Sequence, residues 1–223
     1  MASASVPARA TARPPWETIV AVAAVVSLAL WPIEIHRAFG LPAHPLLIHV
    51  PVVFVPLLGL AVLAVALRFR WFERYGVLVA AFSVVTLAAT NLAVGAGEAF
   101  LEDRQRAFGG VGGMVDPMLA DHRDAGTTLR LALIVLTATL VGLLFARRLP
   151  NAGTIVLRVL AALFALVAIF FVIRTGHLGA KLAWSREGDG PPAGFDGGGQ
   201  GFPGGQAPPG GAQDPAATPS AGG

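Results

Sequence analysis

The residues of this sequence that are best able to do chemistry are its five histidines, His36, His44, His49, His122 and His177. Neutral imidazole is the most common protein ligand for haem iron, copper and zinc. The chain has no cysteine, which excludes disulfides, thiolate metal sites and covalent haem attachment. The cofactors that remain open are a b-type haem, a copper or zinc ion, or none.

Two of the histidines are the strongest candidate ligands. We expect His122 and His177 to matter most, because each lies on a helix that is predicted to extend past the hydrocarbon and has glycine within about one turn. A small residue at that place leaves space for a flat group to approach. His49 is the third candidate. His44 is the fourth candidate. Because it precedes Pro45, its position also suits a helix cap.

Four other polar residues are predicted to support such a site. Glu98 can orient a ligand imidazole, and Arg130, Arg174 and Lys181 can pair with haem propionates. Each of these residues also has a purely structural interpretation. Histidines at helix ends bond to loop carbonyls, Glu98 can be an interfacial acid, and arginine and lysine reach towards lipid head groups.

The composition indicates which elements must position these side chains. Hydrophobic residues make up 55% of the chain and charged residues only 13%, against about a quarter charged in soluble domains. Since about 20 helical residues cross a bilayer, and no strand alternation is visible, we predict an all-α fold. It is a polytopic transmembrane helical bundle with a four-helix core and one N-terminal transmembrane helix. The five apolar segments cover residues 17–38, 45–68, 76–99, 117–147 and 153–184.

Some helix boundaries can be predicted from single residues. Asp116 and Pro117 are typical of an N-cap followed by the first helical position. The last helix continues past Ile173. Pro51 and Pro56 are predicted to kink the helix that contains them. No internal repeat is evident.

The domain organisation follows from these segments. We predict a disordered N-terminus at 1–16, an additional transmembrane helix at 17–40 and a four-helix membrane domain at 41–186. Residues 187–223 are rich in Gly and Pro and poor in large apolar side chains, so we predict a disordered tail.

The distribution of arginine predicts the orientation in the membrane. Arg68, Arg70 and Arg74 lie in one short turn, and Arg147 and Arg148 in another. Because short loops dense in Lys and Arg stay on the inner side, the N-terminus is predicted to be cytoplasmic and the C-terminus outside. All five histidines then lie at the outer membrane face.

Two classes of function have no support in the sequence. The net charge of +3 comes from scattered arginines, so nucleic-acid binding is not expected. No Ser-His-Asp set or carboxylate pair is readable, so we expect no independent catalytic activity.

Four motifs resemble a known family when they are read in order. They are HPLLIHVPV (44–52), the G-x-G-E at 95–98, the D-H-R-x-A-G at 121–126 and TGHLGAKL (175–182). They resemble the bacterial predicted membrane proteins of domain of unknown function 2231, over about residues 41–185. The sequence departs from that family at Val50, where Phe is usual, and at Ala180, where Gly is usual.

The resemblance implies a multi-pass protein of the bacterial inner membrane. It also implies an association with electron transfer, because some family members are fused to Rieske-type or cytochrome c domains, which this chain lacks. The function that we predict is a membrane module that holds a haem or a metal near the outer face, with the lipid bilayer and respiratory redox proteins as partners. The oligomeric state stays open. A cofactor-free structural or accessory protein is one alternative, and a transporter for a small solute or metal ion is another.

Overall fold

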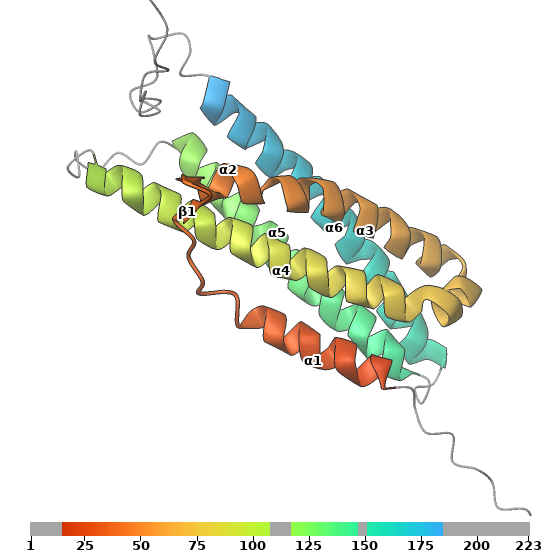
Figure 1. The fold of residues 1–223 in the computed structure, drawn as a ribbon. Helices are drawn as coiled ribbons and strands as arrows, with labels where there is room; N and C mark the ends of the chain where they lie inside the picture. The colour runs from red at the N-terminus through yellow and green to blue at the C-terminus, as the bar shows by residue number, and fades with distance from the viewer. Residues whose placement is uncertain (1–14, 108–116, 147–150, 185–223) are drawn as a thin grey trace, which may run out of the picture. The chain divides into compact units, whose positions relative to one another are not determined.

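A computed structural model describes residues 15–107, 117–146 and 151–184 of the chain. The described residues form helices and one very short β-hairpin (Figure 1). In chain order the elements are α1 (Trp16–Leu28), β1 (Arg37–Ala38), β2 (Leu41–Pro42), α2 (Ala43–Leu47), α3 (His49–Leu67), α4 (Phe69–Ala107), α5 (Pro117–Phe145) and α6 (Asn151–Trp184).

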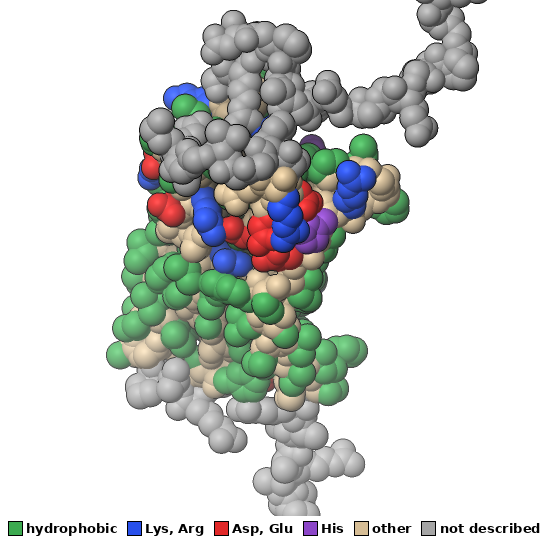
Figure 2. Space-filling view, turned by 90° about the vertical axis from the view of Figure 1, so that its left-hand side faces the viewer, with side chains coloured by type: hydrophobic (Ala, Val, Ile, Leu, Met, Phe, Trp, Pro, Cys, Tyr) green, Lys and Arg blue, Asp and Glu red, His purple; other side chains and the backbone are tan. Residues whose placement is uncertain are grey.

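The core is a ring of four antiparallel helices, which confirms the predicted all-α bundle. α3 packs against α4 and α6, and α5 packs against the same two helices. Within the described parts of the chain, four segments are long and apolar enough to cross a bilayer: α2 together with α3, and each of α4, α5 and α6. One face shows an apolar surface beneath a band of charged and histidine side chains (Figure 2), as expected where lipid tails give way to head groups.

The N-terminal helix is shorter than predicted. A helix was expected over 17–38, but α1 ends at Leu28 and spans 13 residues, or ~20 Å at 1.5 Å per residue. It packs against α4 and α5. Pro32 explains the early end, because proline has no N–H to donate and disfavours helical backbone in the residue before it.

The chain then forms a hairpin that sequence patterns did not predict. Arg37 pairs with Pro42 and Ala38 with Leu41 in antiparallel register. The turn residues Phe39 and Gly40 have φ angles of 53° and 80°, the positive values that a tight two-residue hairpin turn requires.

Proline also explains how the second membrane segment begins. The helix is interrupted at Ile48, between α2 and α3. Pro51 cannot donate to the carbonyl of Leu47, four residues earlier, so the bond that would join the two helices is missing. Pro51 lies in the first turn of α3, and Pro56 lies in its interior.

The ends of the last two helices agree with the sequence. α5 begins at Pro117 and α6 runs on to Trp184, as predicted, while α4 extends beyond both ends of the predicted segment 76–99. The predicted N-cap Asp116 and the predicted disorder of residues 187–223 and of nearly all of 1–16 lie outside the described residues.

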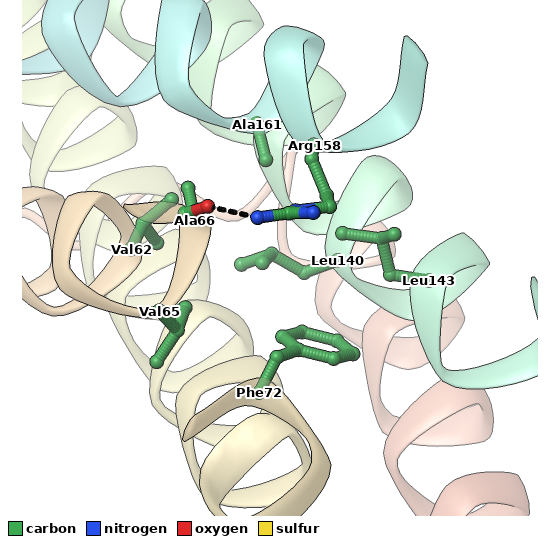
Figure 3. A pocket seen from close by; sticks show the side chains of 8 residues that line it. All are labelled: Val62, Val65, Ala66, Phe72, Leu140, Leu143, Arg158 and Ala161. Atoms are coloured by element: carbon green, nitrogen blue, oxygen red, sulfur yellow. Dashed lines mark hydrogen bonds between the residues drawn. The ribbon is translucent and has the colours of Figure 1, made fainter. Parts of the chain in front are cut away.

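At the bundle end away from the histidines, an arginine of α6 binds the end of α3. The guanidinium of Arg158, on α6, donates to the carbonyl of Ala66 in the last turn of α3 (Figure 3). That carbonyl belongs to a helix end and has no intrahelical partner. The apolar cavity around it measures about 10 Å³, room for about one water molecule.

Candidate functional site

The five histidines gather at one end of the bundle, where α4 and α6 finish and α3 and α5 begin (Figure 1). His36, His44 and His49 come before or at the start of α3. His122 lies in the second turn of α5 and His177 near the end of α6. The grouping expected from the sequence is therefore present, and the individual side chains differ in what they contact.

The His44 ring lies against α4. Its Nδ1 is 2.9 Å from the carbonyl oxygen of Ala93. A Cβ atom at Gly97 would lie 3.1 Å from the same ring, which is tighter than ordinary van der Waals contact. Gly97 therefore makes room for the imidazole itself.

The His122 ring lies against α6 in the same manner. Its Nδ1 is 3.0 Å from the carbonyl oxygen of Thr175. A Cβ atom at Gly179 would lie 3.1 Å from Cε1 of the ring. The second glycine of the G-H-L-G motif thus seats a histidine of another helix.

These two contacts, which we call the histidine clasps, share one design. In each clasp the carbonyl belongs to a residue four positions before the glycine, so that a side chain at the glycine position would cover it. Each joins the two helices of one helical hairpin, and the histidine and the carbonyl residue are 49 positions apart in the first and 53 in the second. The four-helix core is therefore a structural repeat of two helical hairpins, which the sequence did not reveal.

The clasps determine the tautomer of both rings. A carbonyl oxygen can only accept, so Nδ1 is the protonated nitrogen of each neutral imidazole. The lone pair of Nε2 then stays available in both rings, which is the state in which histidine binds a metal. Such a bond from the other ring nitrogen to a carbonyl is typical of ligating histidines.

The two clasped rings also meet each other. The ring centroids of His44 and His122 are 6.4 Å apart, and the ring planes cross at 86°. Phe100 of α4 stacks on His44 at 6.4 Å and 19°. The pair joins helices from opposite sides of the four-helix ring, since α3 follows His44 and α5 carries His122.

Glu98 lies next to this pair on α4, and its partner is an arginine. Arg123 contacts Glu98 through two nitrogens, at 2.8 Å and 2.7 Å. No imidazole is hydrogen-bonded to Glu98 among the residues that the structure describes. Arg123 was not singled out from the sequence, although it directly follows His122.

The other predicted supporting residues divide into one buried and two exposed positions. Arg130 is only 8% exposed, and its Cζ lies 3.5 Å from the centre of the Trp31 ring. Arg174 and Lys181 are exposed on α6.

The remaining histidines lie outside the clasped pair. His49 and His177 are exposed, and Thr175 and Gly179, which contact His122, are two positions from His177, on the other side of α6. His36 binds Asp103 of α4 at 3.0 Å and so holds the β1–β2 hairpin against that helix.

At this end, the described structure places the rings of two histidines, His44 and His122, next to each other. Groups of three or more His, Cys, Asp or Glu side chains that could hold a metal ion do not occur in the described parts of the chain. Two imidazoles alone suit a centre that brings its other ligands with it. The sequence could not show which histidines pair, because their partners are backbone carbonyls; the glycines at 97 and 179 were the one available signal.

The comparisons with known proteins agree with this architecture. A family described as "Predicted membrane protein (DUF2231)" matches residues 40–188. No curated protein and no solved structure matches the chain. The matched range contains both histidine clasps and all four membrane-spanning segments, and since it covers well over half of the sequence, the chain belongs to the DUF2231 family of membrane proteins.

Proposed function

We propose that this membrane protein binds one b-type haem through His44 and His122 and takes part in electron transfer at the histidine end of the bundle. The observation that carries the proposal is the pair of clasps, which orient both rings and leave both Nε2 atoms available. Bound there, a haem would supply a one-electron redox centre. The chain would supply two imidazole ligands and an apolar surrounding that includes Phe100.

The proximity of the two rings supports a shared ligand. The ring centroids of His44 and His122 lie 6.4 Å apart. Two imidazoles that bind one metal ion through bonds of about 2 Å have their ring centres roughly 5 to 6 Å apart.

The number of ligands favours haem over a bare ion. Zinc and copper sites in proteins commonly use three or four ligands, whereas a porphyrin brings four nitrogens and needs two from the protein. The described residues offer two imidazoles at this place. A copper or zinc ion is the second choice on this ground.

The same clasps support one alternative from a different class. In a cofactor-free accessory protein, the Nδ1 bonds of His44 and His122 would serve only to hold α2 to α4 and α5 to α6. That function predicts a loss of stability on replacement of either histidine, on the order of 1 kcal/mol for a lost hydrogen bond, and no spectral change.

Haem titration of the purified full chain in detergent separates the two. We expect wild type to bind one haem per chain, with a Soret band that shifts on reduction by dithionite. His44→Ala and His122→Ala should each abolish this spectrum. His49→Ala and His177→Ala are the matched controls, since both side chains are exposed at the same end, and they should retain it. A wild-type protein that binds no haem, or four variants that all bind it equally, would leave the accessory function in place.

A further inference from the structure

A buried arginine lies within a membrane-spanning helix of this protein. Arg130 belongs to α5, inside the apolar segment Pro117–Phe145, and only 8% of its surface is exposed. A cation at such a place is costly unless it is paired, and ionisable residues in membrane spans commonly mark a binding site. The question is what balances its charge.

The partners of Arg130 in the described structure do not satisfy all of its hydrogen-bond donors. Its guanidinium lies on the face of Trp31, 3.5 Å from the ring centre, which is a favourable cation–π contact. Its Nε is buried and has no hydrogen-bond partner. Trp31 covers one face of the planar group, and the buried Nε–H at its edge is unmatched.

The acid whose charge acts on Arg130 is already paired with another arginine. Glu98 acts electrostatically on Arg130, but its two carboxylate oxygens bind Arg123 at 2.7 Å and 2.8 Å. Arg123 and Arg130 are seven residues apart and so share one face of α5. One carboxylate therefore serves two guanidinium groups, and the buried one lacks a full counter-charge.

We propose that Arg130, covered by Trp31, is a binding site for a carboxylate. The fork of donors on a guanidinium matches the two oxygens of a carboxylate. On the proposed function, on which this identification rests, the carboxylate belongs to a haem propionate; a small free carboxylate is the other source of the same chemistry.

Arg130 and His122 lie on the same helix. The eight positions from His122 to Arg130 span ~12 Å along α5 and differ by about 80° around its axis. Side chains on a helix tilt towards its N-terminus, which for α5 is the end that carries His122, so the long arginine side chain shortens the distance that a carboxylate arm of a ligand at the clasped pair would have to span.

Substitutions can separate carboxylate binding by Arg130 from a purely structural role of this residue. Glu98 stays paired with Arg123 when Arg130 is replaced, so an apolar side chain of similar size at this position leaves no buried charge unpaired. Arg130→Met should therefore fold at least as well as wild type while losing the carboxylate site. Arg130→Lys keeps the charge without the fork and should bind weakly. Arg106→Gln is the control for loss of one positive charge, because that side chain is exposed and paired with Glu102.

The first measurement compares haem with haem dimethyl ester, in which both propionates are uncharged. Wild type and Arg106→Gln should bind haem at least tenfold more tightly than the ester. Arg130→Met should bind the two equally. That result identifies the propionate as the ligand of Arg130.

The second measurement uses no haem. The thermal unfolding temperature is recorded with increasing sodium acetate, against sodium chloride at equal ionic strength. If the site takes a free carboxylate, acetate should raise this temperature in wild type and Arg106→Gln but not in Arg130→Met. If wild type binds no haem, the acetate measurement alone tests the carboxylate site. The proposed function can therefore fail while the carboxylate site is still supported. The carboxylate site is overturned if Arg130→Met matches wild type both in haem-to-ester preference, where haem binds, and in its response to acetate.

Discussion

The tautomer and orientation of the His44 and His122 rings depend on which ring nitrogen is hydrogen-bonded. Each Nδ1 donates to a carbonyl of a neighbouring helix, so each ring is held in one tautomer and one orientation. A histidine that is only an interfacial residue does not need a glycine beneath it. Here both clasped rings have one, at Gly97 and Gly179.

Alanine at either clasp glycine should displace the imidazole. The added Cβ of Gly97→Ala or Gly179→Ala would lie 3.1 Å from its histidine ring, so the ring must shift and its bond to the carbonyl weakens. We expect each variant to lose haem binding at least tenfold and ~1 kcal/mol of stability. Soret titration and thermal unfolding measure the two effects.

Gly176→Ala is the control for the change in helix propensity. Nothing lies within 4 Å of a Cβ at that position, and alanine is favoured over glycine in helices by up to about 1 kcal/mol. This variant should bind haem normally and unfold at the same or a higher temperature. Equal behaviour of all three variants would show that the glycines do not seat the rings.

The limits of prediction at this scale are physical. Residue type made all five histidines candidates, and helix ends placed them at one end of the bundle. Which ring turns inwards depends on the rotation of each helix about its axis. On α6 a difference of two positions separates exposed His177 from Gly179, which contacts His122. Uniformly apolar helices carry little periodicity from which that rotation can be predicted.

Among the elements, α1 and the strand-forming segment after it depend on close contact with α4. The Nδ2 of Asn91 donates to the carbonyl of Ser27 at 2.9 Å. Further along, a Cβ at Gly95 would lie only 2.0 Å from the carbonyl oxygen of Ile33. This backbone approach is possible because residue 95 is glycine.

Gly95→Ala should therefore push residues 33–42 away from α4. Because the chain has no cysteine, a His36→Cys, Asp103→Cys pair can report this through a short thiol cross-linker; these side chains lie 3.0 Å apart. We expect cross-linking to fall at least fivefold in Gly95→Ala. Gly142→Ala, whose Cβ would make ordinary contact at 3.9 Å, should leave the yield unchanged. Unchanged cross-linking in Gly95→Ala would contradict the packing described for this segment.

The sequence predicted the four long helices because long apolar runs leave few alternatives in a membrane. It overestimated α1, since hydropathy continues through residues whose backbone a proline prevents from being helical. The hairpin was not predicted because two-residue strands show no alternation, and Phe-Gly is not the usual Asn-Gly or Asp-Gly turn.

As a whole, the described bundle is two helical hairpins with parallel topology, joined so that α3 meets α6 and α4 meets α5. Parallel repeats of this kind are related by an axis along the membrane normal. The clasped pair lies where the two hairpins meet, at the end that carries all five histidines. The side of the membrane that this end faces is predicted only by the distribution of arginine in the sequence.

The orientation is tested by reporter fusions at Gly153 and Gln213. The dense arginines at 68–74 and 147–148 predict a cytoplasmic position for Gly153 and an external one for Gln213. An exported phosphatase should be active only at Gln213, and a cytoplasmic fluorescent reporter only at Gly153. The reverse pattern would place the histidine end in the cytoplasm.

The central proposal is that His44 and His122 together would hold one haem. Low-temperature electron paramagnetic resonance of the oxidised, haem-loaded protein tests it most directly. Two nitrogen ligands with ring planes crossed at 86° predict a low-spin ferric signal of strong anisotropy, converted to high spin by His44→Ala or His122→Ala and unchanged by His177→Ala. A high-spin signal in wild type, or a low-spin signal that survives both replacements, would contradict the account.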